Sequence, residues 1–481
     1  MSQEKLEKIS SNFGNPFQET KWEKPLPIKE IIDNFQQDKE VSLAGRLVSK
    51  REHGKSGFAH IMDHTGKIQI YAQKNTLGDL YSLYKEIDVG DIIGVKGNLF
   101  VTRTGESTVL AAEIKLLAKA LRPLPEKWHG LKDVEIRYRR RYLDLISNSG
   151  VRDVFIKRSK IVSLIREFFE KRKYIEVETP MLHQIAGGAA GRPFKTHHNA
   201  TDCDVYLRIA PELYLKRLLV GGIERNFEIN RSFRNEGTST RHNPEFTMLE
   251  AYCAYEDYEY MMNLCQELFS MLAEKICSSL VIEYQGRKID FTPPWPRISF
   301  AELFQQEFGV EPQDDQNTVL DKISRKLNLT KGLSRTQILN ITEELIEKNF
   351  PNDKPAFIVD FFTWTSPLAK QRRDNPYIVE RFELFVDGLE VANAYSELND
   401  PVEQKKRFMN QLEVEEELPK RIDDDFLLSL EHGMPPATGL GIGIDRLVMV
   451  LLNQPSIRDV ILFPLLKPLS GSEDESSRSE E

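Results

Sequence analysis

The sequence predicts an α+β protein in which a small β-barrel domain precedes a larger domain of mixed sheet and helices. Three observations predict this order. Short alternating segments separated by glycines fill residues 41–120, a connector with prolines and arginines follows, and longer segments with apolar residues at helical spacing begin at residue 151. The 481 residues are enough chain for two to four domains, each with its own core.

The composition excludes several classes of protein. The longest apolar runs, such as residues 447–452, are far shorter than the roughly 20 residues of a membrane helix. The charged segment 1–10 lacks the apolar core of a signal peptide. The four cysteines form no CxxC pair, which argues against a zinc site or a disulfide framework. We therefore expect a cytoplasmic protein without zinc and without a membrane partner.

The charge is unevenly distributed along the chain. The whole chain carries a net charge of −9, but its first 150 residues carry +4 and the remainder carries −13. The Ser- and Glu-rich tail, residues 470–481, accounts for −4 of this and is predicted to be disordered. An acidic total argues against a polyanionic partner, yet the positive excess lies in the first part of the chain.

Residues 41–120 are typical of an OB-fold barrel that follows a helical extension, residues 1–40. The expected strands alternate β-branched and polar residues, and a helical stretch, residues 77–86, separates the third strand from the fourth. The five strands are expected at residues 41–48, 58–62, 67–71, 91–100 and 108–117. Such barrels commonly bind oligonucleotides, although the pattern alone is a weak functional signal.

A basic linker, residues 121–150, follows the barrel. Prolines near residue 124 resist helix, and the run Arg137–Tyr142 carries most of the positive excess. Two interpretations stay open for this run, namely a nucleic-acid contact or ion pairs between domains.

The segment 151–469 is predicted to be one mixed domain with a helical insertion at about residues 299–350. Apolar residues recur at helical spacing from Phe155 to Phe169, and residues 174–180 form a strand that ends at a proline. Three amphipathic stretches make up the insertion, at residues 299–308, 318–327 and 334–350.

Three segments of this domain carry candidate chemistry. Residues 227–252 predict a strand, a polar loop and a returning strand, with charged side chains and an aromatic ring near the turn. An arginine on a rigid strand can grip a phosphate and a neighbouring ring can stack on a purine, so this hairpin suits ATP. The clustered residues are Arg234, Glu236, Arg241, His242 and Phe246.

The second segment, residues 439–446, has closely spaced glycines but fits neither a dinucleotide-binding nor a P-loop motif. Its glycines permit close approach of a ligand, and Arg446 at the following helix start could face a triphosphate from the side opposite Arg234. The third segment, residues 380–400, places Glu383 and Glu390 around a turn at Gly388, with Glu397 farther along. Such carboxylates suit Mg²⁺ held with phosphate oxygens, or a cationic substrate, whereas a solvated acidic face is the alternative.

Together the three segments resemble the class II aminoacyl-tRNA synthetases, most closely the lysyl-tRNA synthetase family. The Arg234–Gly237 loop resembles the second motif of that class and Gly439–Arg446 resembles its third, while residues 155–180 are similar to the first motif, which forms the dimer interface. Further similar stretches span nearly the whole chain, at residues 121–125, 137–145, 187–189, 192–194, 210–216 and 393–400.

The resemblance implies an OB-fold anticodon-binding domain before a catalytic domain with an antiparallel sheet flanked by helices. It implies a homodimer that binds tRNA(Lys), ATP, L-lysine and Mg²⁺, with Arg234 and Arg446 as the catalytic arginines. The implied ATP-binding residues are Arg234, Glu236, Arg241, His242, Asn243, Phe246, Glu383, Glu390, Gly443 and Arg446, of which Glu383 and Glu390 bind the metal. The implied lysine-binding residues are Gly188, Glu212, Arg234, Glu250, Tyr252, Asn393, Tyr395 and Glu397. The implied anticodon-binding residues are Phe58, Gln69 and Glu113.

A pocket that holds Glu250, Tyr252 and Glu397 offers mainly acceptors and negative charge, which favours a cationic amino acid. Two alternatives remain at this point. One is an aspartyl or asparaginyl enzyme of the same class, and the other is a non-catalytic tRNA-binding relative.

Overall fold

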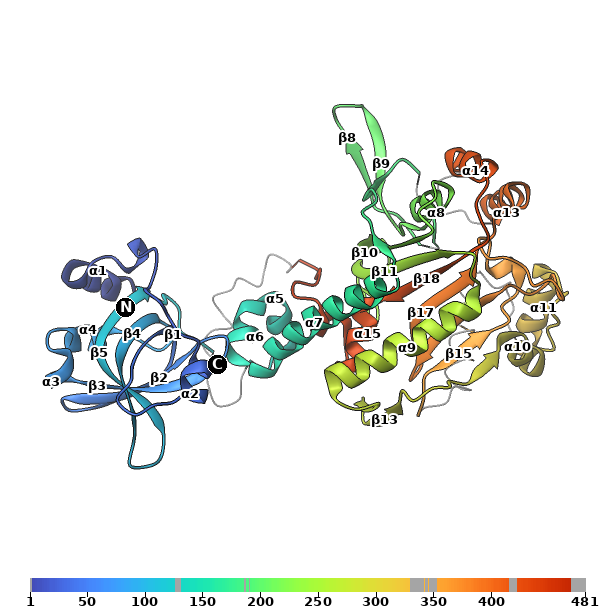
Figure 1. Cartoon of the computed structure of the whole chain (residues 1–481). Coiled ribbons are helices and arrows are strands. Elements are labelled where there is room, and N and C mark those ends of the chain that lie inside the picture. Colours follow the sequence, from blue (N-terminus) through green and yellow to red (C-terminus); the bar gives the residue numbers. More distant parts are fainter. Residues whose placement is uncertain are drawn as a thin grey trace. The chain divides into compact units, whose positions relative to one another are not determined.

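The structure is a computed structural model that describes residues 2–125, 131–185, 187–189, 191–328, 341, 345, 353–414 and 422–468. The chain divides into two compact units, Met1–Lys132 and Asp133–Glu481 (Figure 1). Each unit is described by itself below.

The first unit is built around a closed five-stranded barrel with strand order β1-β2-β3-β5-β4. All neighbouring strands are antiparallel except β3 and β5, and α3 and α4 follow β3 as the sequence predicts. The barrel strands are β1 (Glu40–His53), β2 (Ser56–Met62), β3 (Lys67–Gln73), β4 (Ile92–Val101) and β5 (Ser107–Ala118). The helices are α1 (Ser2–Phe13), η1 (Pro16–Gln18), α2 (Ile28–Asp33), α3 (Lys74–Leu77) and α4 (Leu80–Glu86).

The second unit contains an eight-stranded sheet in the order β14-β15-β16-β17-β18-β11-β10-β6. Its six central strands, β15 to β10 in this order, pair antiparallel, and only the outer pairs β14/β15 and β10/β6 are parallel. The strands of this sheet are β6 (Ile175–Glu176), β10 (Arg225–Phe233), β11 (Glu245–Ala254), β14 (Arg297–Ser299), β15 (Ala356–Val359), β16 (Arg381–Val386), β17 (Leu389–Ser396) and β18 (Ala437–Gly443). The predicted α+β class, with a barrel before an antiparallel sheet, is confirmed.

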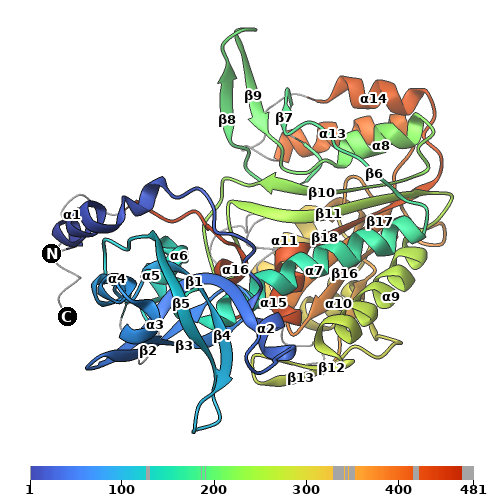
Figure 2. The same ribbon diagram turned by 60° about the vertical axis from the view of Figure 1, so that its left-hand side comes forward.

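Helices cover one face of this sheet. Along β11, β17 and β18 the alternate residues Leu249, Ala251, Ala394, Leu440 and Ile442 are buried in one apolar core with α7, α9 and α15. Figures 1 and 2 show α7 and α9 crossing this face. The helices are α5 (Val134–Arg139), α6 (Arg141–Ser147), α7 (Ser149–Lys171), α8 (Glu212–Val220), α9 (Tyr258–Cys277), α13 (Pro401–Val414), α14 (Asp424–Glu431), α15 (Ile444–Leu451) and α16 (Ile457–Val460). Because side chains alternate along a strand, the other residues of these strands point to the opposite face.

Two smaller sheets and part of the insertion complete the second unit. A three-stranded sheet, β7 (Leu182–His183), β9 (Cys203–Leu207) and β8 (Lys195–His198), projects beyond the main sheet in Figure 2, and β12 (Val281–Tyr284) pairs with β13 (Arg287–Asp290). In the predicted insertion, α10 (Phe300–Phe308) and α11 (Gln316–Lys326) form, and η2 (Thr363–Thr365) follows β15. Most of the third amphipathic stretch, residues 334–350, and the acidic tail, residues 470–481, lie outside the described residues.

The predicted strand at residues 174–180 is short in the structure. Only Ile175 and Glu176 pair with β10, and Val177 adds one backbone hydrogen bond to Phe227 O. The proline at position 180 cannot donate to a sheet, and the chain leaves the edge before reaching it.

The arginine run after the barrel lies in α5 and α6 of the second unit. The guanidinium of Arg141 is fully buried, pairs with Asp144 at 2.7 Å and donates to the backbone oxygens of Arg458 and Leu462. Arg137 pairs with the same carboxylate at 2.9 Å, and Arg139 pairs with Glu135. These three arginines stabilise the second unit internally, which neither earlier interpretation of the run anticipated.

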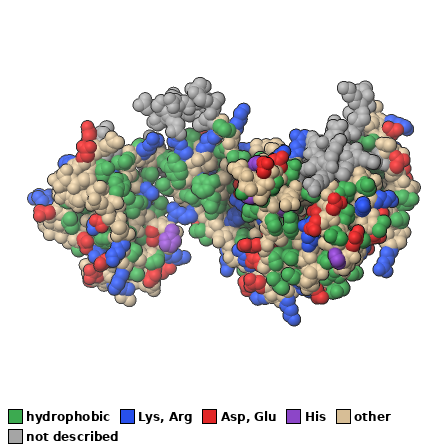
Figure 3. Space-filling view, turned by 90° about the horizontal axis from the view of Figure 1, so that it is seen from above, with side chains coloured by type: hydrophobic (Ala, Val, Ile, Leu, Met, Phe, Trp, Pro, Cys, Tyr) green, Lys and Arg blue, Asp and Glu red, His purple; other side chains and the backbone are tan. Residues whose placement is uncertain are grey.

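On the face shown in Figure 3, lysines and arginines are interspersed with aspartates and glutamates over both units. Within the described part of the chain, no helix combines the length and the apolarity that a membrane crossing requires.

Candidate active site

The opposite face of the main sheet, over part of which α8 and α14 pack, carries two rows of facing residues. In the first row Arg381, Tyr395, Gly439, Tyr252 and Asn226 lie opposite one another on β16, β17, β18, β11 and β10. The second row lies two residues along each strand and contains Glu383, Asn393, Gly441, Glu250 and Glu228. The pleat therefore brings residues that are more than 200 positions apart onto one surface.

Glycines form the centre of this surface. A Cβ atom on Gly439 would lie 2.5 Å from Cε1 of Tyr252 and would also collide with the carboxylate of Glu397. A Cβ atom on Gly441 would meet the Met248 side chain at 3.3 Å. The bare backbone of β18 is therefore what leaves room for the side chains of its neighbours, and for a ligand between them.

Three buried carboxylates surround the Gly439 end of the surface. Glu250 accepts a hydrogen bond of 3.1 Å from the Tyr252 hydroxyl, and Glu212 at the start of α8 accepts one of 2.7 Å from the Tyr395 hydroxyl. Glu397, directly after β17, is completely buried and pairs with Lys216 of α8. Gly188, with φ of +88°, lies over the base of Glu212, whose Cβ would be 3.4 Å from a Cβ on the glycine. Six of the predicted lysine-binding residues, Gly188, Glu212, Glu250, Tyr252, Tyr395 and Glu397, thus lie around this end of the surface.

Burial perturbs the acidity of these groups. Burial, together with the charge of Glu212, raises the pKa of Glu250 to about 8, although the hydrogen bond from Tyr252 acts in the opposite direction. Burial also raises the pKa of Glu397, although the Lys216 ammonium lowers it. A buried carboxylate of this kind is stabilised as an anion when a cation enters beside it. The pocket therefore suits an ammonium group.

The hairpin of β10 and β11 supplies an arginine and an aromatic ring. The guanidinium of Arg234 lies 5.3 Å from the centre of the Phe246 ring, a cation–π distance, and its backbone N–H donates to Pro244 O. Its Nε is buried without a hydrogen-bond partner among the described residues. Glu236 lies beside Gly191 and accepts a weak bond of 3.4 Å from the Arg192 backbone. Arg234 thus keeps donor capacity for an anionic ligand.

A second arginine faces this hairpin from α15. Arg446 donates to the backbone oxygen of Glu390 at 2.8 Å, to its carboxylate at 3.2 Å, and to Nε2 of His242 at 3.0 Å. Because Nε2 of His242 accepts, Nδ1 carries the proton and donates to Ser239, which is the neutral tautomer. Arg241 donates to Gly388 O at 3.4 Å, and Asn243 donates to Glu245 O. The structure therefore gathers most predicted ATP-binding residues around one turn.

A β-bulge determines where Glu390 points. Leu384 pairs with Ala392 and Phe385 pairs with Glu390, so Val391 is the extra residue in β17. Val391 is buried in the helix-covered core, and Glu390 turns back to the side of Asn393 and contacts Arg446. Glu383 pairs with Arg381 and accepts a long bond from Asn393. The bulge thus returns Glu390 to the face that carries Glu383.

These two carboxylates fit a magnesium ion that shares its ligands with a nucleotide. Mg²⁺ commonly takes one or two protein carboxylates and completes its shell with phosphate oxygens and water. No cluster of three or more acidic, histidine or cysteine ligands that could hold a metal occurs in the described ranges. The donor set therefore suits a metal that arrives with phosphate rather than one held by protein ligands alone.

The predicted anticodon residues lie on the outer surface of the barrel. The ring of Phe58 in β2 stacks on Tyr71 of β3 with centres 4.4 Å apart, and Gln69 lies two residues before Tyr71 on the same side. Gln69 contacts Glu106 and Thr108, and Glu113 pairs with Lys96 at 3.3 Å. This surface combines an aromatic platform with hydrogen-bonding groups, as a single-strand binder requires.

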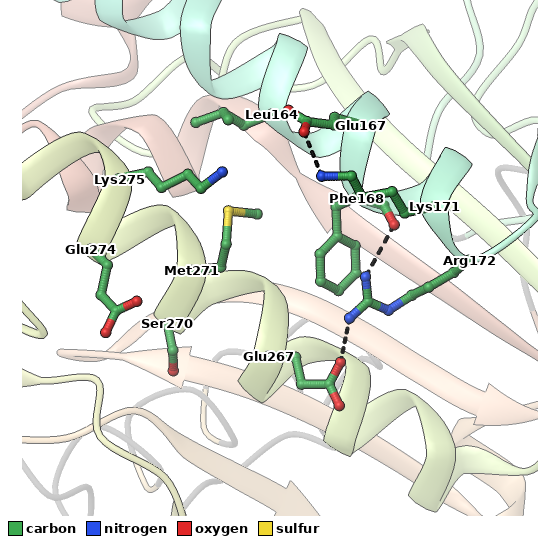
Figure 4. A pocket seen from close by; sticks show the side chains of 10 residues that line it. All are labelled: Leu164, Glu167, Phe168, Lys171, Arg172, Glu267, Ser270, Met271, Glu274 and Lys275. Carbon is green, nitrogen blue, oxygen red and sulfur yellow. Dashed lines mark hydrogen bonds and ion pairs between the residues drawn. The ribbon is translucent and has the colours of Figure 1, made fainter.

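A further hollow lies between α7 and α9, on the helix side of the sheet (Figure 4). Four of its charged groups are paired with one another: Lys171 bonds Glu167 at 2.6 Å, and Arg172 bonds Glu267 at 2.5 Å while stacking on Phe168. We assign it no chemistry.

Sequence reasoning gave no role to two cations of the site. Arg381 pairs with Glu383, donates to Ser366 and stacks on Phe361 at 4.5 Å. Lys216 pairs with Glu212 at 2.6 Å. The spacing of four residues between Glu212 and Lys216, which brings the two side chains together on α8, was the available signal.

Comparison with known proteins gives concordant results. Residues 133–467 match the family of tRNA synthetases class II (D, K and N), and residues 41–123 match the OB-fold nucleic acid binding domain. A lysine--tRNA ligase of Carboxydothermus hydrogenoformans is 53% identical over 96% of this chain and 97% of the relative. The lysine--tRNA ligases of Pelotomaculum thermopropionicum and Clostridium tetani are 51% and 50% identical, over 97% and 96% of this chain and 94% of each relative.

Proposed function

Since the chain belongs to the class II tRNA synthetases and, within them, to the lysine–tRNA ligases, we propose a residue-level account of how it activates lysine with ATP and transfers it to tRNA. The observation that carries this account is the pair of residue rows across β16, β17, β18, β11 and β10. In these rows Gly439 and Gly441 form a floor beside the buried carboxylates, and Arg446 lies next to Gly443 at the end of the same strand.

The acidic pocket binds the two ammonium groups of lysine in this account. Glu250, Tyr252 and Glu397 receive the ε-ammonium and Tyr395 lines the pocket, while Glu212 and Gly188 receive the α-amino group. Support comes from the burial of the carboxylates and from the hydroxyl bonds that orient Glu250 and Glu212. A neutral side chain would leave these groups unpaired, which such sites reject strongly.

The arginine side binds ATP. Arg234 holds the α-phosphate and the lysine carboxylate, Arg446 holds the γ-phosphate, and Phe246 and Glu236 contact the adenine. The remaining residues of this side are Arg241, His242, Asn243 and Gly443, and Asn393 of the lysine-binding set lies beside Glu383. Glu383 and Glu390 would hold Mg²⁺, which would supply charge neutralisation for the phosphates. The free donor of Arg234 and the approach of Arg446 toward the same turn support these assignments.

Activation proceeds by in-line attack of the lysine carboxylate on the α-phosphorus, with release of pyrophosphate. Arg234 and Arg446 stabilise the negative charge that develops on the phosphate oxygens. The terminal ribose hydroxyl of tRNA then attacks the aminoacyl carbonyl and displaces AMP. The account uses no side chain as a nucleophile, so catalysis rests on positioning and electrostatics.

The two alternatives from the sequence fit less well. An aspartyl or asparaginyl enzyme must offer donors to a side-chain oxygen, whereas this pocket presents Glu212, Glu250 and Glu397. A non-catalytic relative has no need of the Arg234 and Arg446 arrangement. The relatives reported above all carry the name lysine--tRNA ligase.

Partners follow from the two units. We propose that Phe58, Gln69 and Glu113 read anticodon bases of tRNA(Lys) in the cytoplasm. We further propose a homodimer through α7 and the segment up to Pro180, because exposed apolar side chains gather there, including Ile156 and Ile175, each 55% exposed. Sedimentation of the full chain tests the dimer.

The test of the catalytic account is lysine-dependent ATP–pyrophosphate exchange with a panel of amino acids. Lysine alone should support strong exchange, and R234A should abolish it. The matched control is R225A, at the other end of the same strand, where the arginine pairs with Glu256 outside the site. Near-normal exchange by R234A, or exchange supported by aspartate or asparagine, would contradict the account.

A further inference from the structure

A buried lysine side chain lies inside the acidic pocket. Lys216 is on the first turns of α8, its side chain has no exposed surface, and its Nζ pairs with Glu212 at 2.6 Å and also with Glu397. Its ammonium lies 5.6 Å from the centre of the Tyr395 ring. One protein ammonium therefore bridges the carboxylate assigned to the α-amino group and the carboxylate assigned to the ε-ammonium.

The Glu397 carboxylate has little else to orient it. Within the described residues neither of its oxygens has a partner at hydrogen-bonding geometry. Its one salt bridge among those residues is the pair with Lys216. Glu250 and Glu212, in contrast, each accept a bond from a tyrosine hydroxyl. A buried carboxylate without donors is unstable as an anion and takes up a proton instead.

The charges of this network match those of the substrate. When all three carboxylates are ionised around a bound cation, Glu212, Glu250 and Glu397 contribute three negative charges and Lys216 contributes one positive charge. The resulting charge of minus two offsets the plus two of the two ammonium groups of lysine, whose carboxylate is assigned to Arg234. Without Lys216 the same pocket would hold one carboxylate in excess.

We propose that Lys216 is a positioning residue for lysine recognition: its ammonium holds Glu397 and Glu212 ionised and in place, and it sets the charge of the pocket to match a diammonium substrate. This inference rests on the proposed function, because it uses the same pocket. Lys216 acts through the two carboxylates and touches neither ATP nor the reacting atoms.

Other charged groups surround this network and belong to its balance. Burial lowers the pKa of Lys216, but the charges of Glu212 and Glu397 raise it by more than burial lowers it. The ammonium therefore stays charged. Several charged or titratable groups on neighbouring elements face these carboxylates. They are Lys216 and Glu212 on α8, Arg208 directly after β9, Glu228 on β10, Glu250 and Tyr252 on β11, Lys370 before β16, Arg381 on β16 and Tyr395 on β17. Arg208 and Glu228 pair with each other at 2.6 Å and contribute no net charge.

The first test is K216M, which keeps the length of the side chain and removes its charge. In lysine-dependent exchange at pH 7.5, KM for lysine should rise about tenfold or more, while KM for ATP and kcat change less than about threefold. The elevated KM should fall as the pH is raised from 7 to 9, because Glu397 without its ammonium partner ionises only at higher pH. R217M on the same helix, which loses its pairs with Asp423 and Asp425, should leave KM for lysine unchanged.

The second test is a double-mutant cycle with E397Q, which also covers the case in which K216M folds poorly. Because E397Q removes one of the two carboxylates that Lys216 serves, K216M should raise KM for lysine by a smaller factor in the E397Q background than in wild type. The inference would be overturned if K216M raised KM for lysine by the same factor in the E397Q background as in wild type. It would also be overturned if KM for lysine in K216M stayed within twofold of wild type. If the wild-type protein shows no lysine-dependent exchange, the proposed function itself has failed, whereas normal wild-type exchange with an indifferent K216M refutes only the role of Lys216.

Discussion

The glycine floor of the site can be tested by adding a single methyl group. In G439A the new Cβ would lie 2.5 Å from Cε1 of Tyr252 and against the Glu397 carboxylate, which is closer than atoms tolerate. The backbone of Gly439 is ordinary β structure, so the substitution adds volume without backbone strain. Overpacking of this kind costs about 1–3 kcal/mol. If the pocket side chains move to absorb it, lysine affinity falls roughly 5- to 150-fold.

The assay is lysine-dependent ATP–pyrophosphate exchange, with KM for lysine and for ATP measured separately. The matched control is G441A on the same strand and face, whose Cβ would meet only the flexible end of Met248 at 3.3 Å. We expect G439A to raise KM for lysine well above that of G441A, with a small effect on KM for ATP. If G439A binds lysine within twofold of wild type, or if G441A is the more damaging change, the reasoning is wrong.

Three further predictions follow from single contacts. Because burial raises the pKa of Glu250 to about 8, above its usual value, the folded protein holds a proton that the unfolded chain releases; the associated stability is present at low pH and is lost as the pH rises toward 8. E250Q should therefore lose less thermal stability than wild type between pH 5 and 8.5 while its KM for lysine rises, and an unchanged pH dependence of the melting temperature would contradict this. D445A removes the partner of Arg158 at 2.5 Å in a buried pair and should lower the unfolding free energy in urea by about 3–5 kcal/mol, whereas E167A, in an exposed pair, should leave it unchanged. F58A removes one ring of the Phe58–Tyr71 stack and should weaken tRNA charging by about 1–3 kcal/mol while pyrophosphate exchange stays normal; equal damage to both reactions would argue against a role in anticodon binding.

Periodicity was sufficient to predict the elements that alternate regularly. The five barrel strands and the hairpin of β10 and β11 lie close to where polar and apolar residues alternate in the sequence. Their ends differ by a few residues because strand pairing continues into segments without an apolar pattern, as in β1, which extends to His53. The strand before Pro180 is shorter than expected because only two of its residues reach β10.

The site residues that sequence reasoning found are those that stand in local motifs. The bulge at Val391 could not be read from the spacing, since regular alternation would place Val391 rather than Glu390 on the side of Asn393. Lys216 was overlooked for another reason: a lysine four residues after a glutamate usually forms an exposed helix pair. Its importance depends on Glu397, which is 181 residues away and meets it only in the folded chain.

The two faces of β18 have different roles, since one packs in the apolar core and the other lines the site. Leu440 and Ile442 are buried with the helices, while Gly439 and Gly441 present only backbone to the ligand. The side chains that distinguish one amino acid from another therefore stand on β11, on and after β17, and on α8, at positions that do not belong to the main apolar core. Substitutions there can alter selectivity while the folding free energy from that core is retained, so a scaffold of this kind can diversify in substrate without being rebuilt.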